Sequence, residues 1–297
     1  MIDGKKWIGD VPRDIYFEDP LSVAADRRQI GTQTVAGGPM TDQADPNGSG
    51  KTPAGGSKTD DPPSAASAGD WKSVIGIEPL KSEIKTIRNT LNGHLQNVGK
   101  FNSGLKDIPA HGATLAVLAG VASAHSEDVS WKKNAKFVRD LAGQMFAEDL
   151  ARGRKSFDQV KTPFEAIIEI LDGGTPAELP ESQDETTFSD VADFGHLMQR
   201  IDRGFKWIQG NARDEESYKA NADRVRHEAA VLGVLAKVIK EEGYGWSDDE
   251  DYVKHADTML NACQTIDKAV AAEKFADYDK AVSTIDQLCT QCHMGRR

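Results

Sequence analysis

The chain has 297 residues, enough for two domains of ordinary size. Its net charge of −11 and its isoelectric point of about 5.2 argue against a protein that binds nucleic acid or an anionic membrane surface. No run of apolar residues approaches the roughly 20 that a helix needs to span a bilayer.

The first 30 residues gather several aromatic and apolar side chains around two prolines. Because this group is too small to form a core, we expect residues 1–30 to dock on the body of the protein or on a partner. The side chains concerned are Trp7, Ile8, Val11, Ile15, Tyr16, Phe17 and Leu21. Residues 31–70 are mostly Gly, Ser, Thr, Pro, Ala and Asp, a composition that predicts a disordered linker.

From Trp71 onward the pattern is helical. Apolar residues recur at spacings of three and four, which is typical of one face of an amphipathic helix. Four such stripes cover residues 80–98, 115–121, 137–150 and 157–171. The last stripe ends at Gly173 and Gly174, a common helix stop. Four amphipathic helices with short connections predict an antiparallel four-helix bundle over residues 71–174.

A connector rich in Pro, Glu and Thr, residues 175–187, precedes a second helical set. The stripes of this set cover residues 191–208, 225–239, 253–266 and 278–292. The acidic run Asp248–Asp251 is predicted to begin a helix, where carboxylates suit the helix dipole. The expected fold is therefore all-α: two tandem antiparallel four-helix bundles, residues 71–174 and 188–297, behind an extended N-terminal segment and a flexible linker.

The motif Cys289-Thr290-Gln291-Cys292-His293 stands near the end of the last helix, and it holds two of the three cysteines in the chain. This pattern is typical of covalent haem attachment, in which the two thiols bond to the vinyl groups of one porphyrin and the histidine ligates its iron. A redox Cys-x-x-Cys is expected near a βαβ pattern, and a zinc site needs further Cys or His at ligand spacing. Neither context is visible, so we expect one covalent haem c.

The two helical sets are similar to each other, which indicates duplication. The segment Leu115–Val121 matches Leu232–Val238, and the stripe 157–171 maps onto 278–292 with a constant offset of 121 residues. In that register the haem cysteines are replaced by Ile168 and Leu171, and the histidine by Asp172. We therefore expect the first copy to be haem-free.

A four-helix bundle with Cys-x-x-Cys-His near its end resembles the cytochrome c′ family, the class II c-type cytochromes. The resemblance covers residues 188–297, and residues 72–172 as a degenerate copy. It implies that Met198, on the first helix of the second bundle, faces the distal side of the iron. It also implies that Arg297 partners a haem propionate or the proximal face. Where the family often has an arginine on that first helix, this chain has Phe194.

Other residues with metal-binding chemistry receive structural interpretations. His196 competes with Met198, but two residues along a helix it points to another face. His227 and His255 are expected to be structural or exposed. Cys263 lies on an apolar stripe and is predicted to be a buried free thiol.

These features predict a monohaem c-type cytochrome that transfers single electrons and is not an enzyme, because no acid–base or nucleophile constellation accompanies the motif. Thioether attachment implies a periplasmic or otherwise extracytoplasmic location, so we expect a leader to have been removed. The expected partner is a redox protein and not nucleic acid; a membrane tether through the leader and a homodimer stay open. Two alternatives also stay open: a five-coordinate haem that binds NO or CO, and a module that docks a larger redox complex.

Overall fold

The computed structural model describes Trp7–Ile8, Val11–Pro12 and residues 71–146, 149–179, 181–182 and 186–295. The chain divides into two compact units, Met1–Thr59 and Asp60–Arg297. In the first unit, β1 (Trp7–Ile8) pairs antiparallel with β2 (Val11–Pro12). The rest of the predicted docking segment, and the whole of the predicted linker at 31–70, lie outside the described residues.

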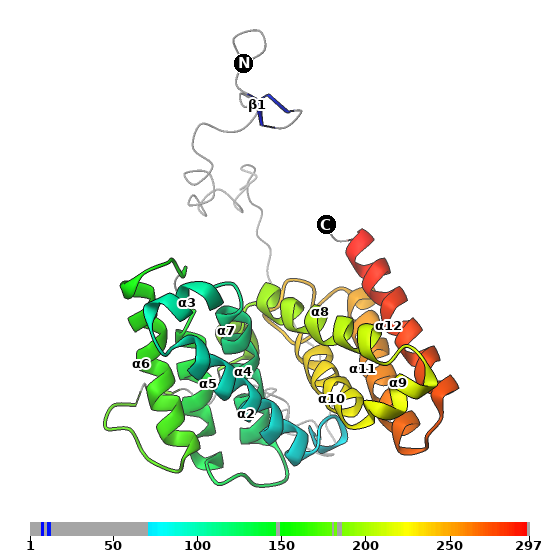
Figure 1. Ribbon diagram of the computed structural model, residues 1–297, viewed down its shortest axis with the longest axis horizontal. Coiled ribbons are helices and arrows are strands. Elements are labelled where there is room, and N and C mark those ends of the chain that lie inside the picture. The colour runs from blue at the N-terminus through cyan, green and yellow to red at the C-terminus, as the bar shows by residue number, and fades with distance from the viewer. Residues whose placement is uncertain are drawn as a thin grey trace, which may run out of the picture. The chain divides into compact units, whose positions relative to one another are not determined.

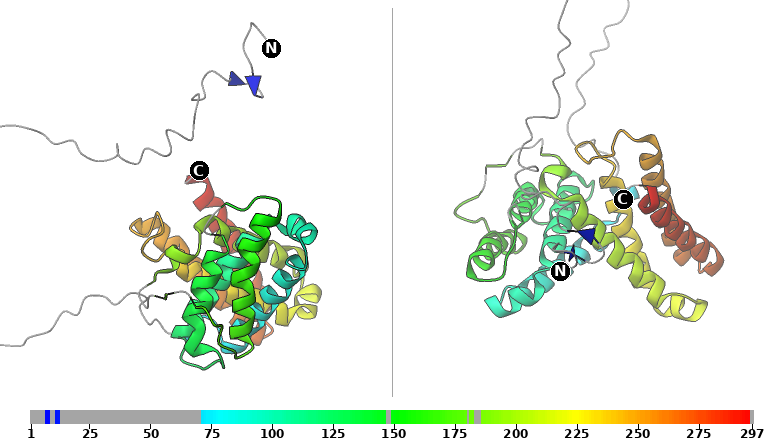
Figure 2. Two further views of the ribbon diagram at one scale, coloured as in Figure 1. Left: turned by 90° about the vertical axis from the view of Figure 1, so that its left-hand side faces the viewer. Right: turned by 90° about the horizontal axis from the view of Figure 1, so that it is seen from above.

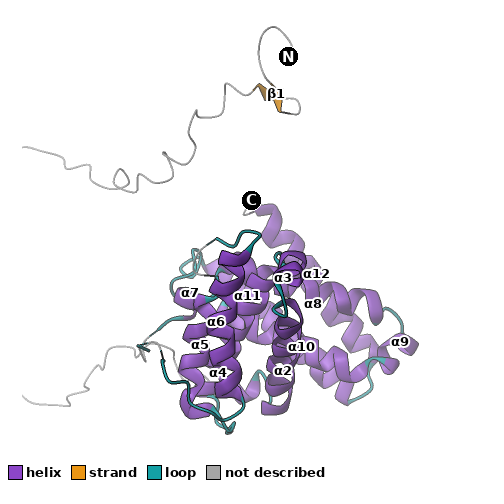
Figure 3. Cartoon of the chain, turned by 60° about the vertical axis from the view of Figure 1, so that its left-hand side comes forward, coloured by secondary structure: helices purple, strands orange, loops and turns teal. Residues whose placement is uncertain are grey.

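The described part of the second unit is helical, which confirms the all-α prediction for it (Figures 1 and 3). After the 3-10 turn η3 (Trp71–Ser73), the first set comprises α2 (Ile77–His94), α3 (Val98–Gly104), α4 (Ile108–Ala124), the 3-10 turn η4 (Lys132–Asn134), α5 (Ala135–Gln144) and α6 (Arg154–Leu171). The short α7 (Phe188–Val191) follows. The second set comprises α8 (Phe194–Asn211), α9 (Glu215–Ala220), α10 (Ala222–Val238), α11 (Glu250–Ala271) and α12 (Phe275–Gly295). None of the helices among these residues is both long and apolar enough to cross a membrane.

Helix boundaries follow the capping residues. The predicted stripe 80–98 is divided between α2 and α3, because the side chain of Asn97 accepts a hydrogen bond from the Lys100 amide and starts a new helix. The predicted stop of α6 is confirmed: Gly173 has φ +88°, the left-handed conformation that favours glycine. The predicted helix start at the acidic run is also confirmed, since Asp249 caps α11 by accepting a hydrogen bond from the Tyr252 amide at 3.0 Å.

The second set repeats the helix order of the first. Helix α8 begins and ends 117 residues after α2, and both have 18 residues. The short α9 follows α8 as α3 follows α2, and α4 and α10 both have 17 residues. This element order supports the duplication indicated by the sequence.

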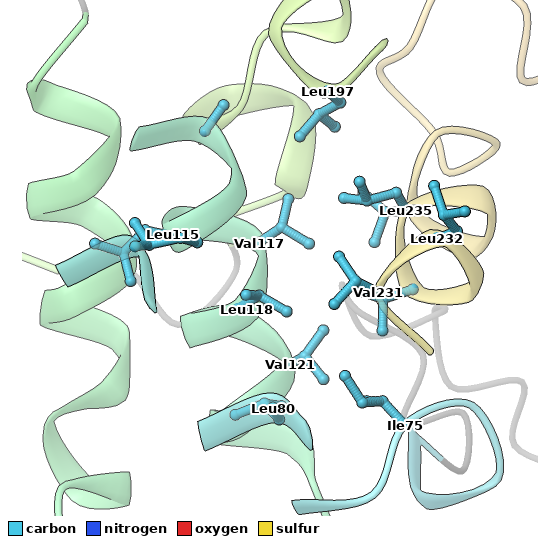
Figure 4. Close-up of a cluster of buried hydrophobic side chains, with 14 of the residues drawn as sticks. Ile75, Leu80, Leu115, Val117, Leu118, Val121, Leu197, Val231, Leu232 and Leu235 are labelled. Carbon is cyan, nitrogen blue, oxygen red and sulfur yellow. The ribbon is translucent and has the colours of Figure 1, made fainter. Parts of the chain in front are cut away.

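The two sets pack against each other through their equivalent helices. Helix α4 of the first set contacts α8 of the second, and α2 contacts α10, so the junction has the pattern of an approximate two-fold axis. Seen from above in Figure 2, the two sets lie on opposite sides of this junction. In Figure 4, Val117 and Val121 of α4 face Val231 of α10, with Leu197 of α8 nearby. The buried side chains form one cluster that continues through both sets.

Candidate haem site

A cavity of about 590 Å³ opens between α8, α11 and α12. It exists because α8 packs on α4 and α10, whereas α12 packs on α11, so the wall formed by α8 stands apart from the wall formed by α11 and α12. Pockets for cofactors commonly have volumes of roughly 300–1,000 Å³, so this space suits a bound group of that kind.

Four of the five predicted haem-contacting residues line this cavity. Cys289, Cys292 and His293 lie on the last turns of α12, and Met198 lies on α8. Both cysteines are free thiols and half-buried, and His293 is exposed. The fifth residue, Arg297, lies outside the described residues. Side chains that are about 95 residues apart in sequence are thus brought to one space by the packing of α8.

The remaining walls are largely apolar. Aliphatic and aromatic side chains from three helices and from the loop before α11 face the space: Phe194, Ile201, Phe205, Ile239, Trp246, Tyr252, Met259 and Leu288. Phe194, at the position where the resemblance expected an arginine, has its ring 5.3 Å from that of Trp246. An apolar lining favours burial of a large macrocycle, because the area removed from water stabilises the complex.

Polar groups close the end of the cavity farther from the C-terminus. The side-chain amide of Gln209 on α8 donates a hydrogen bond to Asp286 on α12, with 2.8 Å between nitrogen and oxygen. Burial raises the pKa of the Cys289 thiol, and the negative charge of Asp286 raises it further. The thiol of Cys289 is therefore protonated at neutral pH when it carries no other bond.

The histidines of the second set separate into two groups. The ring of His196 packs edge-on against Phe146 of the first set at 5.4 Å, which confirms that it points away from the face of Met198. His227 contacts Glu83, with 2.7 Å between Nε2 and Oε2, so its predicted structural role is also confirmed.

His255, in contrast, lines the cavity. Its Nδ1 atom is buried and has no hydrogen-bond partner among the described residues. The sequence contained a signal for this position: Tyr252, His255 and Met259 are spaced three and four residues apart and share one face of α11. With His293 and Met198, His255 is thus a third side chain on the same cavity that has iron-ligating chemistry.

At the equivalent place in the first copy, the two walls are joined by an ion pair. Asp172, which replaces His293, accepts two hydrogen bonds of 2.7 Å from the guanidinium of Arg88 on α2. Arg88 occupies the position of Phe205 in the offset between α2 and α8. Ile168 and Leu171, at the cysteine positions, pack partly buried against the core. These contacts support the prediction that the first copy holds no haem.

Cys263 is the third free thiol, and it is buried as predicted. Burial raises its pKa to about 12. It does not line the haem-sized cavity but a different one, between α2, α10 and α11.

Within the part of the chain that the structure describes, no three or more His, Cys, Asp or Glu side chains converge as metal ligands would. A zinc site needs such a group, whereas a porphyrin brings four nitrogens and asks the protein for one or two ligands. The cavity brings together two thiols, a histidine and apolar walls, which are the groups that a covalent haem would need. Comparison of the chain with protein-family models, with curated proteins and with solved structures gave no match.

Proposed function

We propose that this chain is an extracytoplasmic monohaem c-type cytochrome that transfers single electrons. The observation that carries the proposal is the meeting of both motif thiols, His293 and Met198 on one apolar cavity of about 590 Å³. When bound, the haem would supply a redox-active iron. Thioether attachment belongs to compartments outside the cytoplasm, which is the reason for the proposed location.

Each group of residues has a distinct task in this proposal. Cys289 and Cys292 would hold the haem through two thioethers, and His293 would ligate its iron. Met198, on the facing helix α8, would be a second iron ligand. The apolar walls exclude water, which tunes the reduction potential.

The mouth of the cavity also suits transfer to a protein partner. Among the described residues, the exposed large apolar side chains are Trp246, which lines the cavity, and Met294, which directly follows the haem histidine. Apolar side chains exposed beside a redox centre favour contact with another protein. The partner we propose is therefore a redox protein that docks at the mouth of the cavity, over Trp246 and Met294.

Haem attachment is tested by producing the chain with an export signal and cytochrome maturation machinery. We expect an intact mass increased by one haem, and a pyridine haemochrome spectrum typical of two thioethers. The variant Cys289→Ser should shift that spectrum towards a single thioether. Properly matured wild-type protein without added mass would overturn the proposal, whereas apoprotein from cytoplasmic expression would not bear on it.

The role of Met198 is tested by Met198→Leu in the haem-loaded protein. With Met198 as ligand, the ferric wild type shows the weak long-wavelength band of His/Met coordination, and the variant loses it and becomes high-spin. The alternative is a five-coordinate iron that binds NO or CO. In that case the wild type is already high-spin and reacts with CO as fast as the variant. His255→Leu, measured in parallel, reports whether His255 and not Met198 is the sixth ligand.

A further inference from the structure

Helix α8 has two faces with different neighbours. Its front face, with Met198, Ile201 and Phe205, lines the cavity. Its back face carries Leu197 and Arg200, both buried, and packs on α4 and α10. The position of the cavity wall therefore depends on what holds the back of α8, and part of that support comes from the first copy.

Arg200 is the central contact on the back face. Its Nη2 atom lies 2.9 Å from Oε1 of Glu83 on α2 and 2.9 Å from Oε2 of Glu228 on α10, and its Nε atom also donates to Glu83 at 3.0 Å. All three side chains are less than 10% exposed. Gly204 makes room for this cluster, since a Cβ there would lie 2.5 Å from the guanidinium and 2.8 Å from Glu228.

Glu83 and Arg200 are both charged at neutral pH. Burial alone would raise the pKa of Glu83, but the hydrogen bond from His227 and the charge of Arg200 outweigh burial and lower the pKa to about 2. Burial would lower the pKa of Arg200, whereas Glu83 and Glu228 raise it. A buried guanidinium that stays charged must keep its carboxylate partners, so α8 cannot leave α2 without a large electrostatic cost.

A second contact holds α8 one turn later. Nη2 of Arg203 lies 2.7 Å from Oδ1 of Asp107, and its Nη1 lies 3.2 Å from Nε2 of His111 at the start of α4. Both partners belong to the first copy. Two successive turns of α8 are thus anchored in helices that do not line the haem-sized cavity.

We propose that Arg200 is a positioning residue for the haem site: through Glu83 of the first copy it fixes the α8 wall, and with it Met198, relative to α12. This inference rests on the proposed haem function and assigns a role to the haem-free copy, which serves as the frame for the distal wall. Arg200 is adjacent along the helix to the cavity-lining Ile201, so a shift of the cluster moves the lining directly.

The test compares Glu83→Gln with Glu78→Gln in the full-length haem-loaded protein. Glu83→Gln keeps the size and one hydrogen-bond acceptor but removes the charge that Arg200 needs. Glu78 lies on the same helix, is exposed and pairs with Lys81 three residues later. The readouts are the rate of CO binding to the reduced protein and the midpoint potential, and both can be measured whether or not Met198 ligates the iron.

We expect Glu83→Gln to raise the CO association rate by roughly 3- to 30-fold and to shift the potential, because coupling through such contacts commonly changes by that much. Glu78→Gln should change neither. Unchanged CO kinetics and potential in Glu83→Gln, with only a lower melting temperature, would show a purely structural role and overturn the inference.

Arg203→Gln keeps the inference testable if Glu83→Gln does not accumulate. This variant breaks the more exposed anchor without leaving a buried charge, and we expect a smaller shift in the same direction. If the CO association rate and the midpoint potential of Arg203→Gln are unchanged, the first set does not position α8 for the haem site. Absence of haem from the wild type would overturn the proposed function instead, so the two failures are distinct.

Discussion

The two helical sets share one order of helices but differ where their first and last helices face each other. In the second copy, α8 and α12 stand apart around a cavity of about 590 Å³, with His293 and Phe205 on its walls. In the first copy, the residues at those two positions, Asp172 and Arg88, reach each other and form a bidentate ion pair. The difference teaches that the capacity of this fold to hold a large group depends on a few side chains at the facing helices and not on the helix order, which both copies share.

The largest expected effect comes from removing the two thiols that the second set has and the first lacks. The double variant Cys289→Ser/Cys292→Ser should lose all covalent haem, because the first copy offers no cysteine in its place. Intact mass after denaturation is the measurement. Cys263→Ser is the matched control, since that buried thiol does not line the cavity, and it should keep one haem per chain. A haem retained by the double variant would contradict the asymmetry between the copies.

The next effect contrasts two ion pairs. Glu83→Ala takes one of its two carboxylate partners from the buried Arg200 and should lower the free energy of unfolding by about 3–5 kcal/mol. Asp172→Ala breaks a pair at the protein surface, where water and salt screen the charges, and should cost clearly less. Urea unfolding followed by circular dichroism measures both. Equal losses would mean that the junction between the copies is no tighter than the surface contact within the first.

Acid should weaken the junction in a defined range. The pKa of Glu83 is lowered from 4.5 to about 2 in the folded protein, so its contribution is fully present above about pH 4.5 and is lost as the pH falls towards 2. The shift corresponds to about 3 kcal/mol. Urea unfolding of wild type and Glu83→Gln between pH 6 and pH 2.5 should show curves that converge at low pH. Parallel curves would contradict the lowered pKa.

The smallest expected effect comes from a substitution that gives the second set the residue found at the matching position of the first. Tyr278 occupies the position of Phe157 in the offset of 121 residues, and its hydroxyl donates a buried hydrogen bond of 2.9 Å to the carbonyl of Ala212. Tyr278→Phe leaves that carbonyl without this donor and should cost about 1 kcal/mol. Urea unfolding is again the measurement. Phe157→Leu serves as a control for packing without a hydrogen bond.

The sequence predicted the all-α class and most helices because each helix buries one apolar stripe, and that periodicity is local. It missed the break between α2 and α3, since the apolar positions continue across Asn97 while the backbone does not. The resemblance to the cytochrome c′ family implied that Met198 lies near the Cys-x-x-Cys-His motif. In the structure Met198 and the motif residues line one cavity.

The rest depends on tertiary contacts that periodicity does not contain. Glu83 and Arg200 stand at equivalent positions of the two copies and look like solvated charges in a helical pattern, yet they pair in the interior of the junction. His255 was interpreted as structural because its helix is flanked by polar residues, and only the separation of α8 from α11 turns it towards a cavity. The spacing of His255 with Tyr252 and Met259 shows which helix face it shares, but what that face meets is known only from the packing of the helices.

The opposite signs of Glu83 and Arg200 have a consequence for the independence of the two helical sets. Two identical sets would carry like charges at these matching positions, and like charges in a dry interior repel. With opposite signs the two positions complete each other. A cut between Thr187 and Phe188 would leave Glu83 in one fragment without Arg200 and His227, while Arg200 in the other would keep only Glu228. Each helical set therefore depends on the other for the charge balance of their junction.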